Sequence, residues 1–285
     1  MSEIKYDRQN RIEGWDQSKL STAKVAVVGA GALGNHVCFG LIGLGIGTIK
    51  IFDFDTIEAH NLNRQSLFCE SDVNQSKSEV LAKRLKERNS SLMILGIHEK
   101  VDDDNIDDLF RGVQTVIDCV DLIQVRRVLS RFCLERNIPL IHGGISWHGG
   151  QVGTLTRQTP CINCIYPDSE QEREKQMETS CTRKPEPSVV YISQIISGLM
   201  VERVRRVLMP LPIDPPVEKG LLKYQSELSP PIYFESTNRR DLCDCVTILK
   251  RVAPQILELE QKLKNQKEKE KNSQDLTELK EILGI

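Results

Sequence analysis

The residues best suited to chemistry are three glycines near the N-terminus and a carboxylate that follows them. Gly29, Gly31 and Gly34 have the G-x-G-x-x-G spacing directly after the apolar run 24–28. Such glycines permit a tight turn, let a phosphate approach the backbone and let a helix pack close to the strand. Asp53 ends a second apolar run 22 residues after Gly31, near the offset of about 20 residues at which a carboxylate accepts ribose hydroxyls. The pattern predicts a Rossmann-like nucleotide site, for which a dehydrogenase is the default interpretation.

The residues that follow Asp53 favour a triphosphate over a dinucleotide. Asn61, Arg64 and Lys77 supply polar and cationic side chains after the second apolar run. ATP needs such cations and a metal ion, because it carries more negative charge than the diphosphate of a nicotinamide cofactor. Arg64 or Lys77 taken alone could be an ordinary solvated charge, since charged residues make up 27% of the chain. The prediction of a triphosphate site rests on the order and spacing of these residues together.

Another pair of carboxylates follows the apolar run 113–120. This run reads as a buried strand, and its end places Asp118 and Asp121 at a carboxyl end, where ligands of open α/β sheets bind. We expect Asp121 to hold magnesium. The alternative is that Asp121 caps a helix that begins near Leu122.

Taken together, these segments resemble the ThiF/MoeB/ubiquitin-activating enzyme superfamily over roughly residues 5–250. The ordered set is far more specific than any single motif. It consists of YDRQ with Arg8, GAGALG, DFD with Asp53 and Asp55, NLNRQ with Arg64, Lys77, DCVD with Asp121, and Cys161-x-x-Cys164. The resemblance implies adenylation by ATP of the C-terminal glycine of a small ubiquitin-like (β-grasp) or sulfur-carrier protein, with release of pyrophosphate.

The resemblance also implies a role for each matched residue. Ribose and adenosine contacts fall to Asp53, Asp55 and the glycine turn, and phosphate contacts to Asn61, Arg64 and Lys77. Magnesium falls to Asp121. Arg8 corresponds to the arginine that reaches into the site of the other subunit, which implies a homodimer. Charge neutralisation and alignment must supply most of the acceleration, because a carboxylate is a poor nucleophile toward a polyanion.

Four of the nine cysteines form two close pairs. Cys161 and Cys164 have the C-x-x-C spacing of a zinc half-site, and Cys243 and Cys245 offer the second half. Zinc there would join remote segments of the chain. The second pair departs from the family's C-x-x-C, so the backbone must bend for both sulfurs to reach one ion. The alternatives are a reduced redox pair or inert thiols.

Cys181 is the candidate nucleophile. It lies in the polar segment TSCTRKPEP beside Arg183 and Lys184, and neighbouring cations favour a thiolate. Its position resembles the loop that carries the transfer cysteine in thioester-forming relatives, which implies transfer to a conjugating enzyme. The alternative is an exposed cysteine without a role. The remaining four are expected to be small buried apolar residues without chemistry; they are Cys38, Cys69, Cys119 and Cys133.

Composition predicts a cytoplasmic enzyme. The 285 residues are 39% hydrophobic, enough for one substantial core, and no segment approaches the roughly 18 apolar residues of a membrane span. The N-terminus shows no apolar signal core, so reduced cysteines are expected. A net charge of -2 gives no general attraction to nucleic acid.

The predicted fold class is α/β: a Rossmann-like, doubly wound, mostly parallel sheet with an antiparallel C-terminal extension. We expect a ThiF-type adenylation domain over residues 1–252, with a nucleotide-binding half at about 20–145 and a carrier-binding and zinc half at about 146–252. The patterns indicate helices at 78–88, 123–136 and 188–209 and a strand at 151–156.

The last 33 residues, 253–285, are charged and helix-prone. Most such segments are solvated or disordered helices. Apolar residues at helical spacing nevertheless make a short docking helix for a carrier or conjugating protein an alternative; these are Leu276, Leu279, Ile282 and Leu283.

Other functional classes compete with the leading one. The same fold serves tRNA-modifying dehydratases, which the near-neutral charge and the cysteine pairs make less attractive. A non-catalytic carrier-binding scaffold is disfavoured by the intact Arg64, Lys77 and Asp121. A nicotinamide oxidoreductase fits least well, because the chain carries the triphosphate set.

Overall fold

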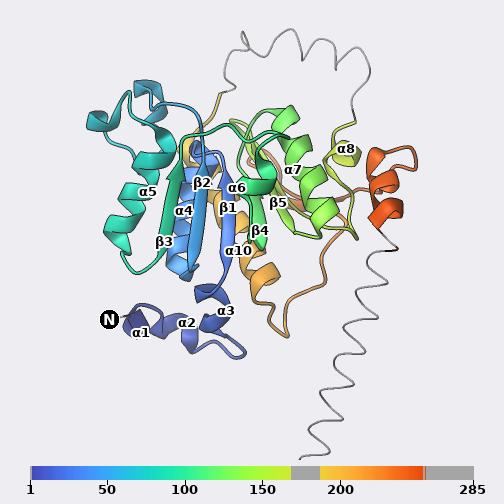
Figure 1. Cartoon of the computed structure of the whole chain (residues 1–285), viewed down its shortest axis with the longest axis horizontal. Helices are drawn as coiled ribbons and strands as arrows, with labels where there is room; N and C mark the ends of the chain where they lie inside the picture. The colour runs from blue at the N-terminus through green and yellow to red at the C-terminus, as the bar shows by residue number, and fades with distance from the viewer. Residues whose placement is uncertain (1, 168–186, 253, 255–285) are drawn as a thin grey trace, which may run out of the picture.

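The β-branched apolar runs form a parallel sheet in the computed structural model, which describes residues 2–167, 187–252 and 254. Its five parallel strands lie in the order β3-β2-β1-β4-β5 (Figure 1). Their bounds are β1 Lys24–Val28, β2 Thr48–Phe52, β3 Met93–Ile97, β4 Thr115–Asp118 and β5 Leu140–Ile145. The strand order reverses direction at β1, so the crevice between β1 and β4 is the switch point where ligands of such sheets bind.

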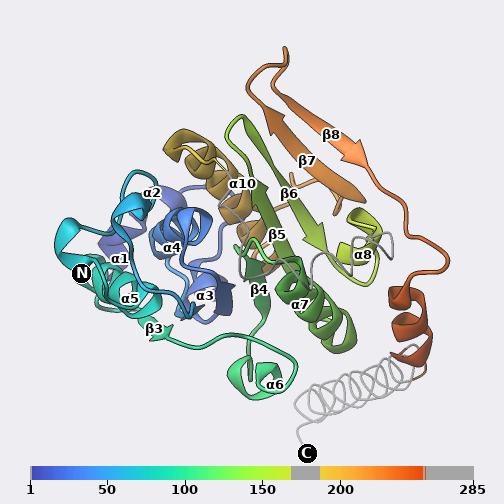
Figure 2. The same ribbon diagram turned by 90° about the horizontal axis from the view of Figure 1, so that it is seen from above.

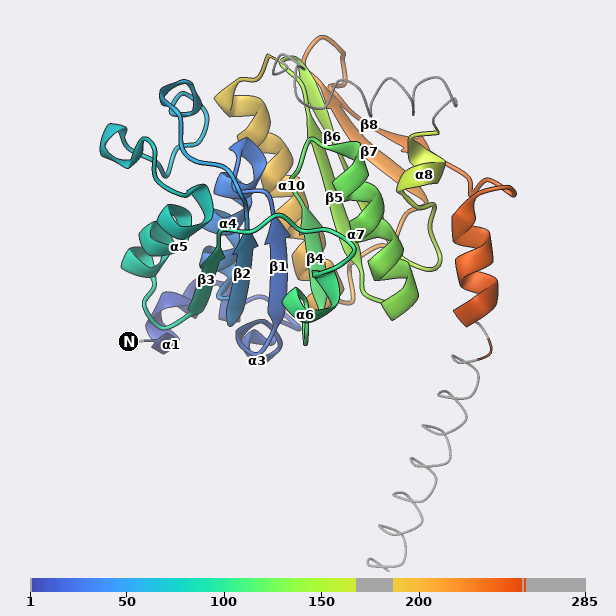
Figure 3. The same ribbon diagram turned by 45° about the horizontal axis from the view of Figure 1, so that its top comes forward.

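Three antiparallel strands continue the same sheet beyond β5. They are β6 Gly149–Leu155, β7 Gly220–Gln225 and β8 Ile232–Ser236, paired in that order. The predicted fold class is therefore confirmed: a parallel α/β half carries an antiparallel extension (Figure 3). Because β6 pairs directly with β5, the glycine-rich end of β5 is a common border of both halves.

Helices cover both faces of the parallel strands (Figure 2). On one face lie α4 Ala32–Leu44, α5 Lys77–Arg88 and α10 Val190–Leu208, and on the other lie α6 Ile106–Leu109 and α7 Ile123–Arg136. Alternate residues of β1 serve the two cores, with Val25 and Val27 in one and Ala26 and Val28 in the other. A strand buried on both sides needs the continuous apolar sequence observed here.

Shorter elements complete the described chain. The helices are α1 Ser2–Lys5, α2 Asp7–Asn10, α3 Gln17–Ser21 and α8 Ile162–Ile165, and the two 3₁₀ turns are η1 Ala59–Asn61 and η2 Glu70–Asp72. Residues 244–252 are also helical. No described helix is long and apolar enough to cross a membrane. The candidate docking residues of the C-terminal tail lie outside the described residues.

The glycine turn between β1 and α4 depends on backbone contacts that a side chain would block. Gly29 has φ +96°, and a Cβ there would lie 2.7 Å from the carbonyl oxygen of Cys119. A Cβ on Gly34 would lie 1.8 Å from the carbonyl oxygen of Gly29. These two glycines therefore let the turn, the first helical turn of α4 and the loop after β4 meet at backbone distance.

We expect Gly34→Ala to destabilise the protein by about 3 kcal/mol, since overpacking against backbone leaves no side chain to yield. Gly43→Ala is the matched control in the same helix: a Cβ there meets nothing within 4 Å. It should stabilise the helix by about 0.5–1 kcal/mol. Denaturant unfolding of both variants measures the difference. Equal stability of Gly34→Ala and the wild-type protein would contradict the close-contact account.

Candidate active site

The glycine turn presents an open helix N-terminus. Gly31 is the N-cap of α4 and makes no side-chain cap. A Cβ at Gly31 would meet only Gln65 Nε2, at 3.9 Å, so protein packing does not require glycine there. The space beside Gly31 is therefore open to a ligand. This agrees with the prediction that a phosphate approaches the backbone at Gly31. The first N–H groups of a helix are donors suited to that anion.

Asp53 connects the glycine turn to the loop after β2. Its Oδ2 accepts a hydrogen bond from the backbone N–H of Ala30 at 2.6 Å, and its Oδ1 accepts from the N–H of Asp55 at 2.8 Å. Burial raises the pKa of Asp53, and the two amide donors act in the opposite direction. Each carboxylate oxygen retains a second lone pair, which leaves acceptors for ribose hydroxyls.

Lys77 is a buried cation beside this loop. It is the first residue of α5 and only 7% exposed, and its Nζ lies 2.8 Å from the carboxylate of Asp55. The backbone N–H of Lys77 also donates to the Asp55 carbonyl oxygen at 3.0 Å. The structure thus brings Asp53, Asp55 and Lys77 together, as the sequence predicts. An ammonium group has three donors, so the pair with Asp55 leaves two for a ligand.

Asn61 and Arg64 lie in the loop between β2 and α5, and both side chains bind within that loop. Asn61 Oδ1 accepts from the N–H of Glu58 at 3.0 Å and closes η1. Arg64 Nη1 donates to the carbonyl oxygen of His60 at 2.7 Å and to Asn63 Oδ1 at 2.9 Å. In this structure both residues shape the loop.

Gln65 is a candidate that the sequence reasoning missed. It is only 3% exposed, and its Oε1 has no hydrogen-bond partner among the described residues. Its Nε2 is the group nearest to the open side of Gly31. Asn35 Nδ2, on the first turns of α4, is likewise buried without a partner in the described chain. The signal was present in the run NLNRQ, but a glutamine carries no charge to draw attention to it.

The two carboxylates at and just after the end of β4 have different environments. Asp118 is fully buried and binds His142. Asp121 is exposed and makes no hydrogen bond or ion pair within the described ranges. The N-cap of α7 is Leu122, so Asp121 does not cap that helix. Asp121 lies on the loop that begins with Cys119. The Cys119 carbonyl packs against Gly29, so this loop touches the glycine turn.

Helix α2, which carries Arg8, lies at the opposite end of the sheet from the glycine turn (Figure 1). The neighbours of Arg8 are anchored: Tyr6 Oη accepts from Asn89 Nδ2 at 2.9 Å, and Gln9 Nε2 donates to the carbonyl oxygen of Leu44 at 3.1 Å. Leu44 ends α4, whose 13 residues separate it by about 20 Å from Gly31. Arg8 itself is exposed. It therefore does not reach the nucleotide site of its own chain.

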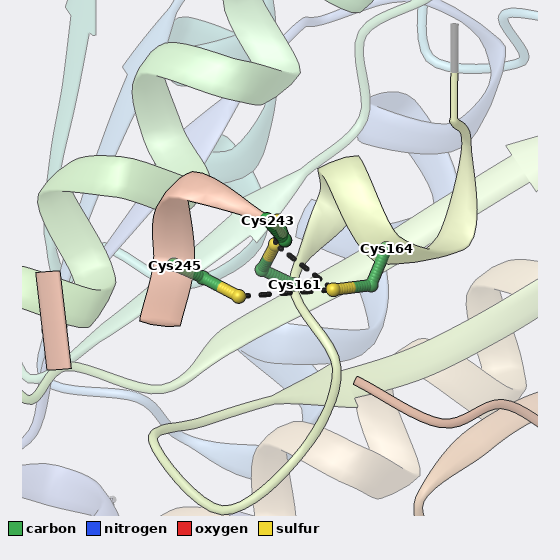
Figure 4. Close-up of side chains that lie close together, drawn as sticks. All are labelled: Cys161, Cys164, Cys243 and Cys245. Atoms are coloured by element: carbon green, nitrogen blue, oxygen red, sulfur yellow. Dashed lines mark hydrogen bonds between the residues drawn. The ribbon is translucent and has the colours of Figure 1, made fainter. Parts of the chain in front are cut away.

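The four paired cysteines converge in one buried cluster (Figure 4). Their sulfurs all lie within 4.8 Å of one another, with Cys161 Sγ 3.5 Å from Cys243 Sγ and Cys164 Sγ 3.7 Å from Cys245 Sγ. A tetrahedral zinc with Zn–S bonds of about 2.3 Å separates sulfurs by about 3.8 Å. The donor set and its spacing therefore fit zinc.

The C-x-C spacing works because Cys243 directly precedes the helical residues 244–252 and Cys245 lies in their first turn. The bend that an extended strand would have to supply comes from this helix start. The cluster joins α8 to the segment after β8, 79 residues later in the chain. All four predicted ligands are brought together.

The thiols of this cluster are perturbed in different directions. Burial raises the pKa of Cys245 to about 12 and also raises the pKa of Cys161. Burial acts in the same sense on Cys164, but the backbone N–H groups of Arg240 and Cys161 lower its pKa overall. Burial disfavours several thiolates at one place, a cost that a bound divalent cation offsets.

The remaining cysteines differ in exposure. Cys38, Cys119 and Cys133 are buried, as expected, whereas Cys69 is exposed at the start of η2. Burial raises the pKa of Cys38, Cys119 and Cys133, in line with inert thiols. Cys181 lies outside the described residues, so its role as a nucleophile stays a prediction.

The chain is similar to known proteins in sequence and in fold. The ThiF family model matches residues 6–245. The chain is 35% identical over 167 residues to the molybdopterin-synthase adenylyltransferase of Salmonella typhimurium, an alignment covering 57% of this chain and 67% of that relative. It is 30% identical over 201 residues to the sulfur carrier protein ThiS adenylyltransferase of Escherichia coli, covering 69% and 80% respectively. Among solved structures, Escherichia coli MccB with ATP is similar, with TM-score 0.65 and 25% identity, covering 80% of this chain and 68% of that one.

The cysteine cluster yields a test of its fourth ligand. Protein purified without chelators should contain one zinc per chain, and Cys245→Ser should lose most of it and lower the Tm by on the order of 10 °C. Cys69→Ser is the control, because this exposed thiol lies outside the cluster. Metal analysis and thermal unfolding report both effects. Full zinc content in Cys245→Ser, or none in the wild-type protein, would refute the four-cysteine site.

Proposed function

Because the chain belongs to the ThiF family, we propose that it adenylates the C-terminal glycine of a ubiquitin-like or sulfur-carrier protein. The family match across residues 6–245 carries this proposal. Two relatives are named as adenylyltransferases, one of them for a sulfur carrier protein, and their alignments cover 57% and 69% of this chain. The assembled glycine turn, Asp53 and Lys77 support ATP as the nucleotide.

In the proposed reaction, a carboxylate oxygen of the carrier forms a bond to the α-phosphorus of ATP. The bond from that phosphorus to the bridging oxygen breaks, and pyrophosphate leaves with the electron pair. The products are a carrier acyl-adenylate and pyrophosphate. Both reactants are anions, so the site must neutralise charge and align them.

We assign the nucleotide contacts to residues at the carboxyl ends of β1 and β2. Asp53 accepts ribose hydroxyls, and the N–H groups at the start of α4 approach a phosphate. Lys77 offers the donors that Asp55 leaves free. Arg64 can exchange its bonds to His60 and Asn63 for phosphate oxygens, since a charged ligand is the stronger acceptor. Asn61 holds the loop that carries Arg64.

We assign magnesium to Asp121 and zinc to the cysteine cluster. Asp121 is an exposed carboxylate without a described partner on the loop that touches the glycine turn, and carboxylates suit magnesium. Bound magnesium would neutralise phosphate charge. Zinc would have a structural role, because a closed four-cysteine set leaves no open coordination position for substrate.

A homodimer completes the site in this proposal. Arg8 is exposed, and its neighbour Gln9 binds the C-terminal end of α4, about 20 Å along that helix from Gly31, while Tyr6 and Gln9 fix the backbone around Arg8. An anchored segment that presents a free guanidinium suits a contact with a second subunit. Thioester formation on Cys181 and transfer to a conjugating enzyme stay predictions of the sequence.

Pyrophosphate exchange into ATP, measured with carrier proteins that end in glycine, tests the proposed chemistry. Lys77→Met should lower the exchange rate by about 100-fold or more, because it removes a cation aimed at developing phosphate charge. Lys86→Met is the control: Lys86 is exposed on the same helix. A wild-type chain that binds ATP but exchanges with no carrier would contradict adenylation. Equal effects of the two variants would contradict the role of Lys77.

Mixing two inactive variants tests the role of Arg8. Arg8→Ala and Lys77→Met homodimers should each be inactive, whereas random exchange of subunits makes half of the dimers heterodimers with one intact site. The mixture should then regain about a quarter of wild-type activity. Activity that stays at the level of the separate variants after confirmed subunit exchange would place Arg8 outside the partner's site.

A further inference from the structure

A buried polar chain runs behind the loop that carries Asp121. His142, on β5, is fully buried, and its Nδ1 lies 2.7 Å from Asp118 Oδ2. Its Nε2 lies 2.7 Å from the hydroxyl of Tyr166, which also accepts a hydrogen bond from Gln151 Nε2. None of these side chains was singled out as functional by the sequence patterns except Asp118, and the proposed chemistry uses none of them directly.

The hydrogen bonds have one consistent direction. Because Gln151 donates to the Tyr166 oxygen, the Tyr166 hydroxyl is free to donate to His142 Nε2. His142 then carries its proton on Nδ1 and donates to Asp118. Burial lowers the pKa of His142 and raises the pKa of Tyr166 to about 12, which agrees with a neutral ring and a protonated phenol. Each buried polar group in this series has a hydrogen-bond partner, so the series favours one arrangement of its side chains.

This chain ends on the backbone of Val120, the residue before Asp121. Asp118 Oδ1 accepts from the Val120 N–H at 3.2 Å. The Val120 carbonyl accepts from Arg126, at 3.1 Å from Nε and 2.5 Å from Nη2. Arg126 Nε also lies 3.6 Å from Asp118 Oδ2. Both backbone polar groups of Val120 are therefore held by one ionic network that His142 supports.

The other end of this hydrogen-bonded series of side chains lies next to the cysteine cluster. Tyr166 is the C-cap of α8, two residues after Cys164, and its backbone N–H donates to Ile162 at 2.8 Å. Closing the cluster fixes α8, and α8 fixes the Tyr166 hydroxyl against His142. A continuous series of contacts thus leads from the cysteines to the loop of Asp121.

We propose that His142 and Tyr166 are positioning residues, which hold Asp121 in place for the magnesium that accompanies ATP. This inference rests on the proposed function only through the assignment of magnesium to Asp121. Partners that orient a ligating carboxylate typically contribute about 10- to 100-fold to metal affinity. Asp118 and Arg126 transmit the constraint, and His142 and Tyr166 keep Asp118 oriented.

The test measures ATP binding as a function of magnesium concentration, without a carrier protein. Tyr166→Phe keeps the ring and removes only the hydroxyl, and His142→Asn removes the link to Asp118. Each should raise the magnesium concentration for half-maximal ATP binding by about 10-fold. Tyr233→Phe is the matched control, because its hydroxyl also binds a glutamine side chain, Gln225, at 3.1 Å. It should leave the magnesium dependence unchanged.

A double-mutant cycle and amide exchange separate positioning from general destabilisation. In an Asp121→Asn background, Tyr166→Phe should have no further effect on the magnesium dependence, because its effect passes through Asp121. The Val120 amide should exchange faster in His142→Asn than in the wild-type protein. Folded variants with wild-type magnesium dependence, or effects additive with Asp121→Asn, would overturn the inference. Failure of every carrier to react would contradict adenylation but would leave these binding results interpretable.

Discussion

Backbone contact between three loops is the constraint on which the site depends. The turn after β1, the loop after β2 and the loop after β4 lie together, and Gly29 and Gly34 let the turn, the start of α4 and the loop after β4 approach one another at backbone distance. Asp53 then ties the first two loops with a hydrogen bond to Ala30, and Lys77 balances the charge of Asp55 nearby. The same closeness brings the Asp121 loop to the glycine turn. Nucleotide binding in this fold is thus a consequence of how tightly three strand ends converge.

The antiparallel half supports the position of these strand ends. β6 pairs with β5, α8 follows β6, and the cysteine cluster attaches α8 to a helix that begins after β8. Zinc bound to this cluster would cross-link segments far apart in the chain, and a cross-link that closes a long loop restricts the unfolded state most strongly. In the native state the cluster also fixes Tyr166, which connects this half to His142 and β5. The cysteine cluster and the loop that carries Asp121 are therefore connected through Tyr166 and His142.

Local patterns in the sequence predicted the elements that depend on local physics. The apolar run 24–28 is β1, the second apolar run before Asp53 is β2, the helix at 123–136 is α7, and the expected helix at 188–209 is α10. The convergence of Cys243 and Cys245 with Cys161 depends on a helix start that C-x-C spacing alone does not reveal. His142 and Tyr166 were missed because each is defined by long-range partners, and Gln65 was missed because it carries no charge. Arg64 was found as a cation, but its bonds inside the loop follow from tertiary structure.

Transfer of an adenylyl group to a carrier protein is the most direct test of this account. The chain would be mixed with ATP, magnesium and each small ubiquitin-fold protein ending in glycine from the same source, and the intact mass of every carrier would be recorded. The account predicts that one carrier gains the mass of a single adenylyl group, and that Lys77→Met abolishes this gain. If ATP binds and no carrier changes mass, the assignment of a protein carboxylate as substrate is wrong.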